Sequence, residues 1–215
     1  MSNDALPAST GTARLVEVVR LIAQTCVDNE TYFSDLDAVA GDGDFGYSLA
    51  RGFEIVLAEF DDYDRSDPGV FLQKVAMTMS SRIGGTSGPI WGTAFLRAGA
   101  TVKGSAEIVP ADVVAMIRAA VEGIKKRGSA EVGDKTLLDA LVPVADALDA
   151  DIDSGADPAS LPRHAAEVAR ESAEATSALQ ARRGRASYTG ERSIGSPDPG
   201  AIAIAVLAER IADAW

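Results

Sequence analysis

The sequence is poor in several residue types, and each shortage narrows the class of protein. Among 215 residues there is one cysteine, Cys26, so no disulfide can form within the chain. There is one histidine, His164, and aromatic residues make up 6%. Basic residues number 20 against 32 acidic ones, which gives a net charge of −12. Because nucleic acids and anionic membranes are bound by clustered lysine and arginine, this balance argues against both as partners.

Long apolar runs are also missing. The longest, residues 201–208, is too short to span a bilayer, and the polar residues 1–11 lack the pattern of a signal peptide. We therefore expect a cytoplasmic protein without a membrane segment. The chain length suits one large domain, and no linker divides residues 12–215, which follow a short N-terminal tail at 1–11.

Alternating β-branched and aromatic segments are absent, whereas apolar residues recur every three or four positions, as on one face of an α-helix. This pattern predicts an all-α fold. Its eight helices cover residues 12–28, 47–60, 68–82, 89–100, 111–126, 135–150, 158–181 and 199–214. Pro143 should kink the sixth helix. Three Asp-Pro pairs, at 67–68, 157–158 and 198–199, predict helix starts capped by aspartate.

Four connections of unusual composition should meet in space. In an up-and-down bundle, alternate connections lie at the same end. The segments 36–46, 84–89, 126–136 and 182–200 each join an odd-numbered helix to the following even-numbered one. We therefore expect them at one end, which is the place to look for a site because loops commonly carry function. His164 falls at the opposite end, where we expect a surface or packing role.

The segment LDAVAGDGDFG, residues 36–46, places Asp37, Asp42 and Asp44 among glycines. Clustered carboxylates suit hard divalent cations, with Mg²⁺ the natural choice where phosphates supply further ligands. A solvated acidic turn is the alternative. The letters GDGDFG match a dinucleotide-binding fingerprint, but the strand that it requires is missing. A calcium loop of the EF-hand type fails because Phe53 stands where its last ligand must be glutamate.

Three other segments contain candidates for binding a phosphorylated ligand. GGTSG, residues 84–88, offers backbone N–H groups and two hydroxyls before a helix, or it is simply a glycine-rich turn. Lys135 and Thr136 are candidates for either a helix start or ligand contact. Arg185 lies in a connection long enough to act as a lid. The alternative role for Arg185 is a surface ion pair. Divalent cations would let an anionic nucleotide and the acidic segment coexist.

Four ordered segments together resemble one family, the nucleotide-binding L subunit of dihydroxyacetone kinases, also called the DhaL or DAK2 domain. They are LDAVAGDGDFGYSLARGF, GGTSGPIWGTAFLRAG, GDKTLLDALVP and GRASYTGERSIGSPDPGA, and the resemblance covers essentially the whole chain. It implies a barrel of eight antiparallel helices with the nucleotide at one end. It also implies two Mg²⁺ ions, held by Asp37, Asp42 and Asp44, that bridge to the phosphates of ADP or ATP.

The same resemblance implies the rest of the nucleotide site but no catalytic side chain on this chain. The implied nucleotide-binding residues are Phe45, Gly46, Tyr47, Ser48, Thr86, Ser87, Gly128, Thr136 or Leu137, Arg185, Asp198, Pro199 and Gly200. Phe45, Ser48 and Ser196 depart from the residues common in the family, which bears on individual phosphate contacts but leaves the implied metal ligands intact.

The resemblance implies phosphoryl transfer to a small ketose, dihydroxyacetone or a relative such as erythrulose, held on a separate K-type subunit. Two phosphoryl donors are open. One is a phosphotransferase-system protein that recharges bound ADP, and the other is exchangeable ATP. A nucleotide-binding regulator without catalysis and a structural adaptor are the alternative functions. The sequence leaves open the identity of the ketose, the donor and the oligomeric state, a homodimer included.

Overall fold

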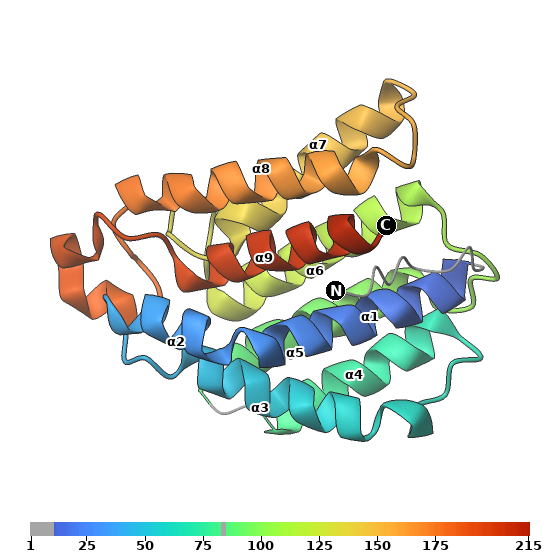
Figure 1. The fold of residues 1–215 in the computed structure, drawn as a ribbon, viewed down its shortest axis with the longest axis horizontal. Helices are drawn as coiled ribbons and strands as arrows, with labels where there is room; N and C mark the ends of the chain where they lie inside the picture. Colours follow the sequence, from blue (N-terminus) through green and yellow to red (C-terminus); the bar gives the residue numbers. More distant parts are fainter. Residues whose placement is uncertain (1–10, 83–84) are drawn as a thin grey trace.

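The computed structural model describes residues 11–82 and 85–215, and within these ranges it contains helices and no strand, so the expected all-α class is confirmed (Figure 1). The α-helices are α1 (Gly11–Asp28), α2 (Glu30–Ala38), α3 (Phe45–Ala58), α4 (Pro68–Arg82), α5 (Ser87–Thr101), α6 (Pro110–Gly128), α7 (Leu138–Asp153), α8 (Leu161–Ala175) and α9 (Pro199–Ala214). Short 3₁₀ helices are η1 (Phe60–Asp62), η2 (Thr176–Ala178) and η3 (Arg185–Ser193). Residues 1–10 of the expected N-terminal tail lie outside the described ranges.

The long helices are arranged as a ring of neighbours. From α3 to α9, each helix packs against the next one along the chain, while α1 contacts both α3 and α9 (Figure 1). The Arg14 guanidinium lies over the Trp215 ring at 3.6 Å, which joins the start of α1 to the end of α9. The short helix α2 packs on α3 and α9. These contacts hold the connections between helices at two opposite ends.

Apolar side chains fill the ring in two main clusters. The larger one lies among α1 to α5 and is rich in aromatic residues, including Phe33, Phe53, Phe60, Phe71 and Trp91. The second joins α7, α8 and α9 and is built largely from small side chains, among them Ala165, Ala169 and Ala173 of α8. Because alanine adds little bulk, these positions let α8 approach its neighbours closely. The packed helices therefore form a firm base for the connecting segments.

The largest departure from the expected fold is an additional helix. The first expected helix ends at Asp28, as α1 does, but a new helix, α2, starts at Glu30. Its Phe33 side chain is fully buried, which fixes α2 against the rest of the molecule. Asp37 therefore lies in the last turn of α2 and not in an open loop. The expectation of eight helices was short by this element.

Two helices begin later than expected. The helix expected from residue 135 starts at Leu138, because the Asp139 carboxylate accepts hydrogen bonds from the N–H groups of Gly133 and Thr136 and holds a turn there. The helix expected over 158–181 covers only Leu161–Ala175, followed by η2. Asp157 stabilises a turn by accepting from Ala159 N at 3.0 Å, which delays the start of α8.

Two of the three expected Asp-Pro caps are confirmed. Asp67 accepts from Val70 N at 2.9 Å at the start of α4, and Asp198 accepts from Ala201 N at 2.8 Å at the start of α9. The Asp157 cap was wrong for the reason just given. Pro143 lies inside α7, which continues past it to Asp153.

The end of the molecule where α7 meets α8 contains His164. Its Nδ1 lies 2.6 Å from a carboxylate oxygen of Asp151, and the imidazole is half-exposed, in agreement with the expected surface role. No helix in the described ranges is both long enough and apolar enough to span a bilayer.

Candidate functional site

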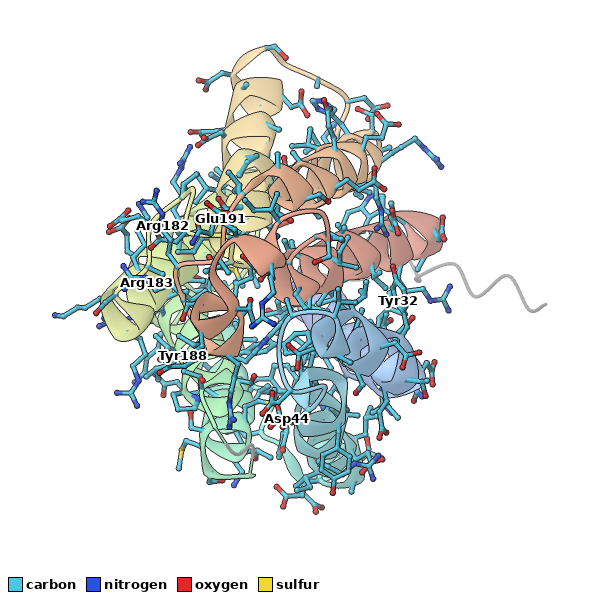
Figure 2. All side chains as sticks on the ribbon, turned by 90° about the vertical axis from the view of Figure 1, so that its left-hand side faces the viewer. Tyr32, Asp44, Arg182, Arg183, Tyr188 and Glu191 are labelled. Carbon is cyan, nitrogen blue, oxygen red and sulfur yellow. The ribbon has the colours of Figure 1, made fainter. Side chains whose placement is uncertain are left out.

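The unusual connections meet at the end of the ring opposite His164, and several contacts join them. Arg185 of the connection between α8 and α9 pairs with Asp42 at 3.0 Å. Lys135 Nζ donates to Ser196 O at 2.6 Å, which joins that connection to the one between α6 and α7. Figure 2 looks onto this end, where Asp44 and Tyr188 are labelled. The expected convergence of these connections is therefore present.

The connection between α4 and α5 reaches the same region through the start of α5. A Cβ atom added at Gly128, the last residue of α6, would lie 3.2 Å from the Ile90 Cδ1 atom of α5. Thr86 and Ser87, at the start of α5, are therefore near the end of α6. The Thr86 side chain, at the N-cap position, makes no cap hydrogen bond with the described residues of this helix start. Gly84 of the GGTSG segment lies outside the described residues.

Three carboxylates gather between α2 and α3. Each of Asp37, Asp42 and Asp44 can place an oxygen so that the three atoms lie within 4.8 Å of one another. Asp37 is at the end of α2 and also accepts from Phe45 N at 3.3 Å, while Asp44 immediately precedes α3. A side chain at Gly41 would collide with the Asp37 carboxylate. The glycine-rich turn is thus what allows the three aspartates to share one small volume.

The charge of this cluster is only partly balanced. Partial burial and the neighbouring carboxylates of Asp42 and Asp37 raise the pKa of Asp44, whereas the Arg185 guanidinium lowers it. One arginine faces three acids, so a further cation would be favourable here. All available donors are carboxylate oxygens, which are the ligands that Mg²⁺ and Ca²⁺ prefer. The cluster therefore fits a hard divalent cation.

Close packing between α2 and α3 sets the position of the cluster. Gly46, in the first turn of α3, lies so close to α2 that an added Cβ would collide with Glu30 O and approach Ser34 N to 2.6 Å. Tyr47 N donates to Ser34 Oγ at 3.1 Å across the same contact. Phe45, Gly46, Tyr47 and Ser48 form the N-terminal turn of α3. This end of a helix favours negative charge.

The turn before α7 is held by two aspartates. The Asp139 carboxylate accepts from Thr136 N at 2.7 Å, and the Asp134 carboxylate pairs with Arg183 Nε at 2.8 Å. Leu137 precedes α7, and a Cβ atom at Gly200 would lie 3.3 Å from Leu137 Cβ. The turn and the start of α9 are therefore in direct contact. The structure therefore places Leu137 and Gly200 side by side, with Thr136 next to them in the chain.

Asp198, at the start of α9, lies among several polar groups. Its carboxylate accepts from Ala201 N, and its own N–H donates to Thr176 Oγ1 at 2.8 Å. Burial raises the pKa of Asp198 to about 7, and the charge of Asp139 adds to this, while backbone N–H groups and the Lys135 ammonium oppose it. Pro199 and Gly200 follow in the first turn of α9. Asp198 thus caps a helix within the site end.

One residue at this end has a role that the sequence did not reveal. Lys135 was a candidate for a helix start or for ligand contact, yet its side chain is 4% exposed and bonded to backbone carbonyls. Its backbone has φ = 63°, a left-handed conformation that is uncommon outside glycine. A single sequence carries no signal for such a contact, because the three carbonyls come from positions more than forty residues away.

Comparison with known proteins agrees with this geometry. Residues 39–213 match the model of the DAK2 domain family. The ADP-binding subunit DhaL of the PEP-dependent dihydroxyacetone kinase of Escherichia coli is 36% identical over 181 residues, which are 84% of this chain and 86% of that protein. The corresponding DhaL of kinase 1 of Listeria innocua is 39% identical over 84% of this chain and 85% of its own length.

Longer proteins also contain a related region. The L-erythrulose 1-kinase of Mycolicibacterium smegmatis is 39% identical over 93% of this chain, which corresponds to 35% of that enzyme. A crystal structure of the dihydroxyacetone kinase of C. freundii in complex with AMP-PNP and Mg²⁺ superimposes with a TM-score of 0.75 at 25% identity. That comparison covers 98% of this chain and 35% of the C. freundii chain.

Proposed function

Because the chain belongs to the DAK2 domain family, we propose that it is the nucleotide- and magnesium-binding subunit of a dihydroxyacetone-type kinase. The observation that carries this proposal is the group of three aspartates within 4.8 Å, at the end where the motif-bearing connections meet. Relatives of similar length are named ADP-binding subunits, and a related structure contains AMP-PNP and Mg²⁺. Family, fold and donor set thus support the same activity.

In this proposal each part of the site has a separate task. Asp37, Asp42 and Asp44 would hold two Mg²⁺ ions, the number that the family resemblance implies. Bound metal would neutralise negative charge on the phosphates. The N-terminal turn of α3, with Phe45, Gly46, Tyr47 and Ser48, lies beside the phosphates, and the positive end of its helix dipole favours their negative charge. Thr86 and Ser87 offer backbone N–H groups to phosphate oxygens from α5.

The remaining residues surround the rest of the nucleotide. The part of the nucleotide beyond the phosphates is lined by Gly128, Thr136 or Leu137, and the turn formed by Asp198, Pro199 and Gly200. Arg185 balances phosphate charge. Phosphoryl transfer depends mainly on positioning and charge neutralisation, so the chain needs no catalytic base of its own.

The acceptor and the donor lie on other molecules. We propose that a small ketose, dihydroxyacetone or erythrulose, is the acceptor, because relatives named for each ketose contain this region. A separate K-type subunit would hold the ketose, because relatives of similar length are named as subunits. A phosphotransferase-system protein that recharges bound ADP is one donor, since several relatives are named as dependent on PEP or on that system. Free ATP is the other. A cytoplasmic localisation and assembly into a homodimer stay predictions.

The proposal is tested by titrating the purified chain with ADP and with ATP, in the presence and absence of Mg²⁺, by calorimetry. Wild type should bind nucleotide only with Mg²⁺. Asp42→Asn should abolish this binding, because it removes a metal ligand, with little effect on thermal stability, because the pair that it breaks is exposed. Asp35→Asn, on the exposed side of α2, is the matched control and should bind like wild type.

The outcomes separate the candidate functions. Nucleotide binding that survives Asp42→Asn unchanged contradicts the metal assignment. Binding that is intact, but without phosphoryl transfer when K-type partners and either ketose are added, supports the alternative of a non-catalytic regulator. Absence of any Mg²⁺-dependent binding would leave only the structural adaptor.

A further inference from the structure

Lys135 contacts both ends of the long connection between α8 and α9. Its ammonium donates to Leu179 O at 3.1 Å, before the connection, and to the carbonyls of Ser193 and Ser196, near its end. The ammonium has three N–H donors, and each meets one backbone carbonyl. One side chain from another part of the chain thus bonds to both ends of the segment from Gln180 to Pro197, at its base. We call this segment the cover.

The backbone at Lys135 is arranged to allow this contact. Its left-handed conformation, φ = 63°, is unfavourable for a residue with a side chain. Hydrogen bonds on both sides hold it in place, since Asp134 accepts from Glu131 N and Asp139 accepts from Thr136 N. Strain that the surrounding structure maintains is a reason to look for a function.

The cover has additional ties at the same base. Ser193 is fully buried, and its hydroxyl accepts from Ala181 N at 2.9 Å, which joins the two ends of the cover directly. Arg183 pairs with Asp134, the residue before Lys135. Beyond these ties, the middle of the cover has few attachments to the other described residues, and Tyr188 there is 89% exposed. Its position thus depends on how the base is held.

The cover is connected to the acidic cluster through Arg185, whose guanidinium lies 3.0 Å from Asp42. Arg185 is the cover residue that reaches the cluster, and it follows Arg183 by two positions. Fixing the base of the cover therefore also limits where Arg185 can be. Lys135 itself faces carbonyl oxygens and is buried, so it is not placed to contact a ligand.

We propose that Lys135 is a positioning residue that fixes the base of the cover and thereby places Arg185 over the metal and nucleotide site. The inference rests on the proposed function for the ligand but not for the tether, and the two are tested separately. Lysine suits this task because it is long, carries three donors and has no acceptor that would repel a carbonyl.

The tether is tested without nucleotide, by limited trypsin digestion. The cover contains Arg182, Arg183, Arg185 and Arg192, so cleavage within it reports its opening. Lys135→Met keeps the length and the backbone strain but removes all three donors. We expect cleavage within the cover to become about tenfold faster, as the loss of a few hydrogen bonds predicts. Lys126→Met, the same change on the exposed surface of α6, is the control, and its cover should be cleaved no faster than that of wild type.

The positioning role is tested by Mg²⁺-dependent ADP titration. Lys135→Met should lower nucleotide affinity about tenfold in the wild-type background but hardly at all when Arg185 is already alanine, because the effect passes through Arg185. A purely structural contribution would lower affinity equally in both backgrounds. Lys135→Arg, which keeps donors on a bulkier group, should restore part of the affinity.

Each outcome decides one part of the inference. Equal cleavage of Lys135→Met and Lys126→Met overturns the tether. Faster cleavage with unchanged ADP affinity, or an affinity loss that is independent of Arg185, overturns the positioning role. If wild type binds no ADP, the proposed function fails, and the tether is still judged by cleavage. If Lys135→Met does not fold, Lys135→Gln, which retains two N–H donors, replaces it in both measurements.

Discussion

The pair between Arg185 and Asp42 shows how single residues balance charge at the site end. The Arg185 side chain is 66% exposed, so the pair adds little to stability. Its position matters more, because one guanidinium faces three carboxylates that would otherwise only repel one another. Arg185 therefore acts as a cation at the cluster, and in the proposed function the same guanidinium would balance phosphate charge.

This double use predicts opposite effects of one substitution. Arg185→Ala should leave the affinity for Mg²⁺ alone unchanged or higher, because a competing cation is removed. The affinity for ADP with Mg²⁺ should fall about tenfold, because a charge-assisted contact is lost. Calorimetric titrations of metal alone and of ADP with metal measure both. Arg192→Ala, an exposed arginine of the same cover, is the control, and an equal loss there would contradict the assignment.

A second residue-scale prediction concerns Asp198 and pH. Burial raises its pKa from 3.8 to about 7 in the folded protein, so the folded state binds a proton more tightly than the unfolded state. The contribution of this group to the free energy of unfolding is therefore fully present below pH 3.8 and is lost as pH rises toward 7. The slope is at most about 1.4 kcal/mol per pH unit for one proton.

Asp198→Asn should remove this part of the pH dependence. Asparagine is also a good helix cap, so α9 keeps its start. Urea unfolding of both proteins between pH 4 and 8 measures the difference, with Asp139 and Lys135 as the charged neighbours that wild type and variant share. Identical slopes for the two proteins would show that Asp198 does not titrate in this range.

At the level of single residues, the sequence predicted what types of group would gather but not how each is held. Carboxylates separated by glycines pointed to a metal site, and the structure brings Asp37, Asp42 and Asp44 together. The tether made by Lys135 was not predictable, because its carbonyl partners belong to a distant segment and carbonyls are present at every residue.

At the scale of elements, the contact between α2 and α3 determines the shape of the cluster. The two helices bring Asp37 from one side and Asp44 from the other, and they approach closely because Gly46 has no side chain. The arrangement of the three aspartates thus depends on a packing contact that contains none of them.

Gly46→Ala should therefore disturb both stability and metal binding. The added methyl would meet backbone atoms of α2, which cannot move without separating the helices. We expect a loss of about 1–3 kcal/mol in stability by overpacking and a clear loss of Mg²⁺-dependent ADP affinity, measured by urea unfolding and calorimetry. Gly123→Ala, whose methyl would meet the flexible Arg97 side chain and a methyl of Thr93, should lose less stability and retain ADP affinity. Normal ADP affinity in Gly46→Ala would show that the contact between α2 and α3 does not determine nucleotide binding.

Elements were predictable where periodicity dominates and missed where local hydrogen bonds compete. The ranges of α4 and α9 agree with the sequence pattern, since each has an aspartate cap followed by proline. The short α2 was missed because a nine-residue segment with one buried aromatic, Phe33, gives little periodic signal. The starts of α7 and α8 were placed too early because aspartate side chains stabilise turns there.

At the scale of the whole molecule, the two apolar clusters differ in how much bulk they can accept. The α8 side of the second cluster is lined by alanines, and Ala169 is fully buried. Ala169→Leu should cost about 1–3 kcal/mol, because the larger side chain would push α8 away from α7 and α9. Thermal unfolding measures this. Ala175→Leu, at the exposed end of α8, is the control, and equal stability of both variants would mean that the cluster has spare room.

The overall arrangement was predictable to the extent that it follows from connectivity. Helices joined in sequence pack as neighbours, so assigning connections alternately to two ends was enough to bring the three aspartates, the turn before α7 and the cover to one end. Sequence patterns did not show that α9 would return to α1, because this contact depends on the sum of all the packing angles.

The stacking of Arg14 on Trp215 brings the first turn of α1 beside the last residue of α9, away from the aspartates (Figure 1). The order in which the helices are covalently joined is therefore partly arbitrary. In a circularly permuted chain, a short peptide would join the end of α9 to the first turn of α1, and new termini would be opened between α7 and α8. Every residue of the proposed site would then stay where it is now.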